Sequence, residues 1–182
     1  MSEKYPMHCV CTYEEAEAHI EAAKSFWISP CVCRDDGAGC ERSRHEVCLG
    51  FVREAVSQPA KARPVTREEA EANWIYAKET GLVPRPFRNA NDKSITEGLC
   101  FCCDCCCTYI AGGDKDYDKG RLVEKTDLAR CTHCGACEPV CFFGARPMKS
   151  GALALVRDKC AGCGLCVDAC PEECIEMMVR ES

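Results

Sequence analysis

Cysteine is the residue that most constrains what this chain can fold into. The sequence holds 21 cysteines among 182 residues, a content that indicates stabilisation by cross-links or metal in addition to an apolar core. Disulfide scaffolds are typical of secreted chains, but the first residues, Met1 to Pro6, are polar and lack the apolar stretch of a signal peptide. An odd number of cysteines also fits complete disulfide pairing poorly. We therefore expect thiolates that hold metal, in a cytoplasmic and oxygen-poor setting.

The last third of the sequence contains an internal repeat of cysteines. Each copy has three cysteines separated by two residues and then a fourth: Cys131, Cys134, Cys137 and Cys141, followed by Cys160, Cys163, Cys166 and Cys170. This is the spacing of bacterial ferredoxins, in which the fourth cysteine of each run ligates the other cluster. A pair of zinc sites is disfavoured, because zinc sites pair two short cysteine hooks. Residues 122–179 thus resemble the two-cluster [4Fe–4S] ferredoxin domain.

The resemblance implies two [4Fe–4S] clusters with crossed ligands. One cluster takes Cys131, Cys134, Cys137 and Cys170, and the other takes Cys160, Cys163, Cys166 and Cys141. Gly135, Gly162 and Gly164 stand where backbone N–H groups would approach the cluster sulfurs. The first copy departs from the second, since Phe142 stands where the second copy has Pro171. A ninth cysteine of this segment, Cys174, is expected to be a buried free thiol.

The repeat leaves the cysteines of the first half unexplained. Four of them span a short stretch: Cys31, Cys33, Cys40 and Cys48. They are predicted to supply one further [4Fe–4S] site, whose negative charge Arg34, Arg42 and Arg44 would offset. Structural zinc is the rival interpretation for the same four thiols.

A second group of cysteines lies between Cys100 and Cys107. Its candidate ligands are Cys102, Cys103, Cys105 and Cys106. Neighbouring side chains diverge in an extended chain, so alternate residues would serve two metal centres or one larger cluster. The C-x-C-R start and this cysteine run resemble uncharacterised ferredoxin-type proteins that extend the dicluster domain. We expect the two N-terminal groups to come together and hold one or two further clusters, with Cys9 and Cys11 as added ligands or a terminal thiol pair.

The remaining pattern predicts an α+β chain: a mainly helical, cysteine-rich N-terminal domain followed by the ferredoxin-like domain. Helices are predicted over 13–28 and 47–56, and from Thr66 to Gly81, with capping boxes at Thr12 and Thr66. Short strands are predicted over 152–156 and 176–179. The predicted domains are residues 1–112 and 121–182, joined by the glycine-bounded connector 113–120.

Charge and motifs narrow the classes of function. The net charge of −6 argues against a nucleic-acid partner, and no apolar run is long enough for a membrane span. No catalytic triad, phosphate loop or dinucleotide motif is present. The favoured interpretation is an electron carrier that passes single electrons to or from a partner redox enzyme. The alternatives are an enzyme or enzyme subunit with an open iron site in its N-terminal cluster, and a metal-sensing or cluster-delivery protein.

Overall fold

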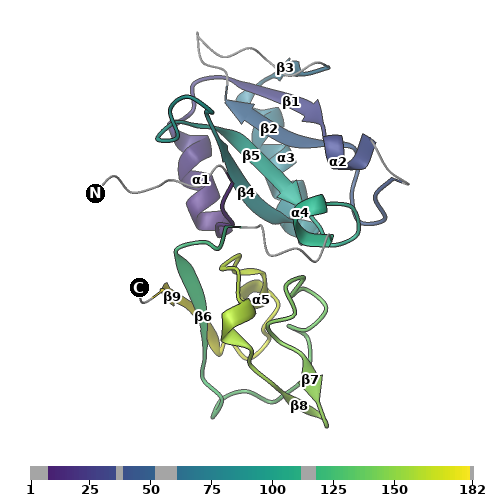
Figure 1. Ribbon diagram of the computed structural model, residues 1–182, viewed down its shortest axis with the longest axis vertical. Helices are drawn as coiled ribbons and strands as arrows, with labels where there is room; N and C mark the ends of the chain where they lie inside the picture. The colour runs from purple at the N-terminus through teal and green to yellow at the C-terminus, as the bar shows by residue number, and fades with distance from the viewer. Residues whose placement is uncertain (1–7, 36–38, 52–60, 112–117, 181–182) are drawn as a thin grey trace.

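The computed structural model describes residues 8–35, 39–51, 61–111 and 118–180 (Figure 1). These residues form an α+β molecule with two parts. The N-terminal part, residues 8–111, contains a five-stranded sheet, and the C-terminal part, residues 118–180, contains two sheets of two strands each. None of the helices in these ranges could serve as a membrane span, since the longest, α3, has 13 residues.

The five-stranded sheet is antiparallel throughout, in the order β3-β1-β2-β5-β4. Its strands are β1 (Phe26–Pro30), β2 (Glu46–Phe51), β3 (Arg63–Val65), β4 (Val83–Arg88) and β5 (Thr96–Cys102). Two helices, α1 (Tyr13–Ala22) and α3 (Arg67–Glu79), pack on one face of it. Alternate residues of β2, namely Val47, Leu49 and Phe51, join the buried cluster under these helices, as the two-residue period of a strand requires.

Two aromatic side chains lie across glycines of the central strands on the other face. A Cβ atom added to Gly50 would stand 1.7 Å from the ring of Trp27, and one added to Gly98 would stand 2.4 Å from the ring of Phe87. The two rings are also neighbours, with centroids 6.3 Å apart. Glycine at both positions therefore lets the aromatic pair lie flat against the sheet.

The prediction of a mainly helical N-terminal domain was wrong. The first predicted helix ends at Ala22, and Phe26–Pro30 is the strand β1. The start of the second predicted helix, over 47–56, is the strand β2, and residues 52–56 lie outside the described residues. Both segments are short apolar runs buried on two faces, for which residue spacing alone does not separate strand from helix.

The starts of α1 and α3 were predicted correctly. Thr12 and Glu15 form a reciprocal capping box at α1, and Thr66 and Glu69 form another at α3. Gly81 follows the end of α3 with a φ of 70°, a left-handed conformation that glycine adopts without strain. Each capping box and the terminal glycine involve residues only a few positions apart, so they can be recognised from the sequence alone.

The C-terminal part pairs its first strand with its last. In it, β6 (Leu122–Thr126) runs antiparallel to β9 (Ile175–Val179), and β7 (Met148–Lys149) pairs with β8 (Ala152–Leu153). The turn η1 (Arg157–Lys159) and the short helix α5 (Leu165–Asp168) lie between them in the chain. Two further short helices belong to the N-terminal part. Helix α2 (Val32–Asp35) contains Cys33, and helix α4 (Thr108–Ala111) begins directly after Cys107. The predicted strands over 152–156 and 176–179 correspond to β8, which is shorter, and β9.

The two parts share a buried core. Val10 donates a backbone hydrogen bond to Asp118 (3.0 Å), and Arg121 pairs with Glu15 of α1 (2.7 Å). The same apolar cluster that lies under α1 and α3 includes Ala161 and Leu165 of the C-terminal part. Most of the predicted connector, residues 113–117, lies outside the described residues.

Candidate metal centres

The first cavity of the C-terminal part is lined by cysteines from both copies of the repeat. Its walls include Cys131, Cys134, Cys137 and Cys170. These are the four ligands predicted for one cluster. His133 stands in their loop with a φ of 55° and accepts a hydrogen bond at Nδ1 from the backbone N–H of Leu153 (3.1 Å).

The second cavity is lined by the other four cysteines of the repeat: Cys141, Cys160, Cys163 and Cys166. The backbone N–H of Ala145 donates to the sulfur of Cys141 (3.3 Å). Gly162, with a φ of 88°, allows close packing, because a Cβ there would stand 2.4 Å from the carbonyl oxygen of Leu122. Local backbone geometry thus brings the cysteine loop against β6.

The donors of both cavities fit an iron–sulfur cluster. Each cavity offers four thiols of the repeat, and the first also has Cys174 in its wall; thiols are the soft ligands that such clusters take. The eight cysteines of the repeat are spread around the walls of two cavities, as a cluster of several atoms requires. Among the described residues, the group of thiols that converges tightly enough for a single ion lies in the N-terminal part.

Arg146 is buried between the two cavities and lines both. Its Nη1 donates to Glu124 Oε2 (2.8 Å) and to Thr126 Oγ1 (3.0 Å), while Nε and Nη2 have no hydrogen-bond partner in the described part of the chain. Burial lowers the pKa of its guanidinium, but the thiolate of Cys137 and other nearby anions outweigh that effect and raise it. The arginine therefore stays charged. The cysteine pattern of the repeat did not predict that Arg146 would lie at these sites.

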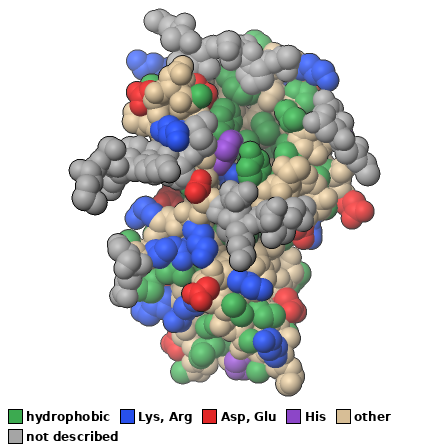
Figure 2. Space-filling model, in the orientation of Figure 1, with side chains coloured by type: hydrophobic (Ala, Val, Ile, Leu, Met, Phe, Trp, Pro, Cys, Tyr) green, Lys and Arg blue, Asp and Glu red, His purple; other side chains and the backbone are tan. Residues whose placement is uncertain are grey.

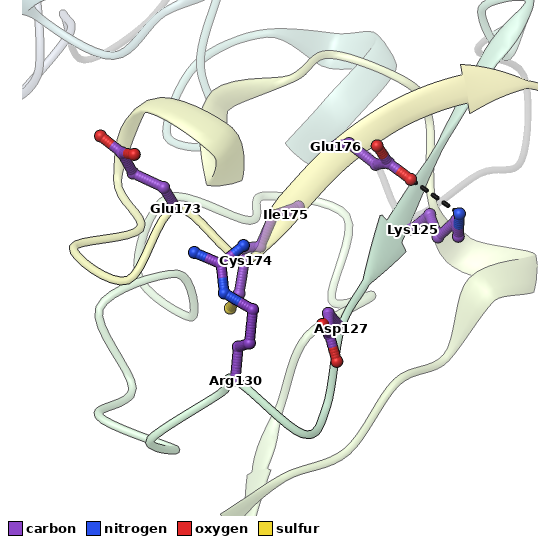
Figure 3. Close-up of a pocket in the computed structure, with 7 residues that line it drawn as sticks. All are labelled: Lys125, Asp127, Arg130, Glu173, Cys174, Ile175 and Glu176. Atoms are coloured by element: carbon purple, nitrogen blue, oxygen red, sulfur yellow. Dashed lines mark ion pairs between the residues drawn. The ribbon is translucent and has the colours of Figure 1, made fainter.

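Cys174 is buried, as predicted for a free thiol, but it lies beside the first cavity. Its sulfur is 3.5 Å from that of Cys170. The residue also lines an open hollow of the surface, whose walls carry Lys125, Asp127, Arg130, Glu173 and Glu176 (Figure 3). Cys174 thus stands between a charged surface hollow and a predicted cluster ligand.

In the N-terminal part, one group of four cysteines converges. Cys40, Cys103, Cys105 and Cys106 place their sulfurs within 4.8 Å of one another. Cys40 lies in the loop before β2, and the other three lie in the turn after β5. Burial alone would raise the pKa of Cys40, but hydrogen bonds, the largest of them from Arg34, lower it to about 6.

The other N-terminal cysteines form smaller groups. Cys48, on β2, lies beside Cys100 and Cys31, and these neighbours together with burial raise its pKa well above 9. Cys102 and Cys107 lie together beside the buried Arg85, whose Nη1 is 3.7 Å and 3.9 Å from their sulfurs. The remaining three are separate: Cys33 contacts Thr108, Cys11 donates to the carbonyl of Pro84, and Cys9 lies beside Asp118.

The structure therefore regroups the predicted N-terminal ligands. Of Cys31, Cys33, Cys40 and Cys48, only Cys31 and Cys48 contact each other, and Cys40 joins the later run. Within that run, Cys102 lies apart from Cys103, Cys105 and Cys106. These pairings connect residues far apart in the sequence, so spacing gave no signal for them.

The predicted counter-charges are also redistributed. Arg34 reaches the sulfur of Cys103 (3.8 Å), and Arg42 pairs with Asp104 (2.6 Å) beside the same group. Arg44 instead donates to the side chain of Asn73 (2.7 Å). Arg85 had not been recognised from the sequence; its isolated position on β4 gave no signal.

Comparison with known proteins identifies the family of the C-terminal part. The family model described as a 4Fe-4S dicluster domain matches residues 130–175. Ferredoxin-1 of Rhodobacter capsulatus is 40% identical over 61 residues, which are 30% of this chain and 94% of that protein. This chain belongs to the dicluster ferredoxin family. The prediction that the repeat is a dicluster ferredoxin domain is confirmed.

Two other relatives match over a smaller share of their own length. A subunit of an ion-translocating oxidoreductase complex from Methanosarcina acetivorans is 33% identical over 63 residues, 35% of this chain and 24% of that protein. An uncharacterised ferredoxin of Methanocaldococcus jannaschii is 46% identical over 43 residues, 22% of this chain and 26% of that protein. The chain thus spans about a quarter of each. No solved structure matches it.

Proposed function

We propose that this protein carries single electrons through two [4Fe–4S] clusters to or from a partner redox enzyme. The observation that carries the proposal is the pair of cavities, each lined by three cysteines of one copy of the repeat and the fourth cysteine of the other. When bound, each cluster accepts and releases one electron at a time. The names of the relatives, a ferredoxin and a subunit of an oxidoreductase complex, support the same class of function.

The residues around the cavities suit this role. Thiols bind the iron atoms, and the fixed charge of Arg146 lies between the two sites, where it favours the more negative, reduced form of each. The crossing of Cys141 and Cys170 ties the two halves of the repeat together, so that both sites are held by one folded unit.

The ligand assignment is tested with double substitutions that differ only in how the cysteines are combined. Cys131→Ser with Cys170→Ser removes two ligands of one predicted set, and Cys131→Ser with Cys141→Ser removes one from each. We expect the first pair to cost about four iron atoms per chain and the second about eight. Anaerobic iron and sulfide analysis, with EPR of the reduced protein, measures the loss. Equal losses from the two pairs would contradict the crossed sets.

The prediction of one or two further N-terminal clusters now requires other ligand sets. Cys40 belongs with Cys103, Cys105 and Cys106, which leaves Cys31, Cys48 and Cys100 together on the sheet face. We propose that any additional iron–sulfur cluster of this part binds outside the Cys40 group. Its iron would appear in the same analysis as an amount beyond that of the C-terminal part.

A further inference from the structure

The four thiols of Cys40, Cys103, Cys105 and Cys106 are unusually close to one another. The sulfur of Cys103 is 3.5 Å from that of Cys40, 3.4 Å from that of Cys105 and 3.2 Å from that of Cys106. Cys40 and Cys105 are 3.6 Å apart. The other two pairs also lie within 4.8 Å, so the four sulfurs surround one small point.

The spacing matches a single metal ion. A tetrahedral ion with metal–sulfur bonds of about 2.3 Å places its four sulfurs about 3.8 Å from one another. An iron–sulfur cube places each thiolate outside a different iron atom, and the body of the cube then separates the thiolates further. Sulfurs at 3.2–3.6 Å leave no room between them for such a cube.

The C-terminal part of the same molecule provides the contrast. Its eight repeat cysteines line the walls of two cavities, and no three of them have sulfurs within 4.8 Å of one another among the residues that the structure describes. The chain therefore holds two geometries of four thiols: one spread around a cavity, the other gathered to a point. They call for metal centres of different size.

The surroundings also suit an anionic tetrathiolate site. Arg34 is buried, and its Nη2 donates to the carbonyl of Phe101 (3.0 Å) and approaches the sulfur of Cys103 (3.8 Å). Its Nε and Nη1 have no hydrogen-bond partner in the described residues. A buried cation without a carboxylate partner needs nearby negative charge, and the four thiolates of a divalent ion leave a net charge of −2.

We propose that Cys40, Cys103, Cys105 and Cys106 bind one tetrahedral metal ion, with Zn²⁺ as the expected ion, rather than an iron–sulfur cluster. Soft thiolates in a tetrahedron suit zinc or a single iron. A site closed by four protein ligands is structural, because no position is open to substrate. The ion joins the loop before β2 to the turn after β5, and so fixes the end of the sheet that carries the other N-terminal cysteines.

Metal analysis of the anaerobically purified chain tests the proposal with a matched pair of variants. Cys105 is exposed, so Cys105→Ser removes a ligand without a buried defect. Cys31→Ser is the control, because Cys31 belonged to the ligand set predicted from spacing but lies outside the tetrahedron. We expect one zinc per chain in the wild type and in Cys31→Ser, and at least a tenfold loss of zinc occupancy in Cys105→Ser under competition with a chelator. Cys105→His, which keeps a zinc ligand, should restore occupancy.

Spectroscopy gives a readout that does not depend on stability. X-ray absorption at the metal edge should show four sulfur neighbours at about 2.3 Å. A single iron with four sulfurs and no sulfide would also support a one-ion site. Loss of four iron atoms with sulfide in Cys105→Ser, or equal loss of zinc in both serine variants, would overturn it. Iron in the C-terminal part is counted separately, so failure here is distinguishable from failure of the proposed electron-transfer role.

Discussion

Arg146 shows how one side chain can serve two sites. It is 2% exposed and lies against the walls of both C-terminal cavities. Its burial is offset by Glu124, which is also 2% exposed and pairs with it at 2.8 Å. Breaking a buried pair by removing one partner typically costs about 3–5 kcal/mol, so the arginine supports the fold as well as the charge balance of the sites.

We predict that removal of the Arg146 charge lowers the reduction potentials of both clusters. Reduction adds negative charge, which a nearby cation stabilises, so in the double variant Arg146→Met with Glu124→Gln both potentials should lie roughly 50–100 mV below those of Glu124→Gln alone, the size expected for one charge several Å away at an effective dielectric constant near 20. Anaerobic redox titration followed by EPR measures the shift. Both variants avoid leaving Glu124 as an unpaired buried charge, and they differ only in the charge of residue 146. Equal potentials in the two variants would refute the role of Arg146.

The elements divide into those set by local signals and those set by distant contacts. Thr12 with Glu15 and Thr66 with Glu69 fix their helix starts within four residues, and these starts were predicted. The strand at Val47 was predicted as helix, because its burial depends on α1 and α3 on one face and on Trp27 on the other. The convergence of Cys40 on Cys103 is equally nonlocal. The cysteine repeat was predictable because each copy carries its own spacing, although Arg146 between the sites was not.

At the scale of one strand, we predict that Gly50→Ala destabilises the N-terminal sheet. The added Cβ would meet the ring of Trp27 at 1.7 Å, and overpacking of this kind costs about 1–3 kcal/mol. The thermal midpoint followed by far-UV circular dichroism should fall. Trp27→Leu in the same chain should recover part of the loss, because the smaller side chain makes room. If the two substitutions simply add, the ring contact is not the cause.

Across the whole molecule, the two cavities differ in what covers them. Phe142 and Phe143, beside the second cavity, pack against the shared core, and Arg42 of the N-terminal part lies over the ring of Phe142 at 4.7 Å. This contact gives a role to the phenylalanine that stands where the second copy has proline. In the first cavity Cys134 is exposed, whereas Cys160 and Cys166 of the second are buried. Electrons are therefore expected to enter and leave through the first site.

Charge around the first site should then control the rate of exchange with charged redox reagents. Basic side chains gather on the face of the C-terminal part shown in Figure 2, while acidic residues, Glu173 among them, lie beside Cys174 (Figure 3). We predict that the protein, at a net charge of −6, is oxidised by the cation hexaammineruthenium(III) at a rate that falls as ionic strength rises. Glu173→Gln should lower this rate at low salt more than Glu79→Gln, which removes the same charge from α3. Stopped-flow absorbance of the reduced protein measures both rates, and equal effects of the two variants would mean that the first site is not the place of entry.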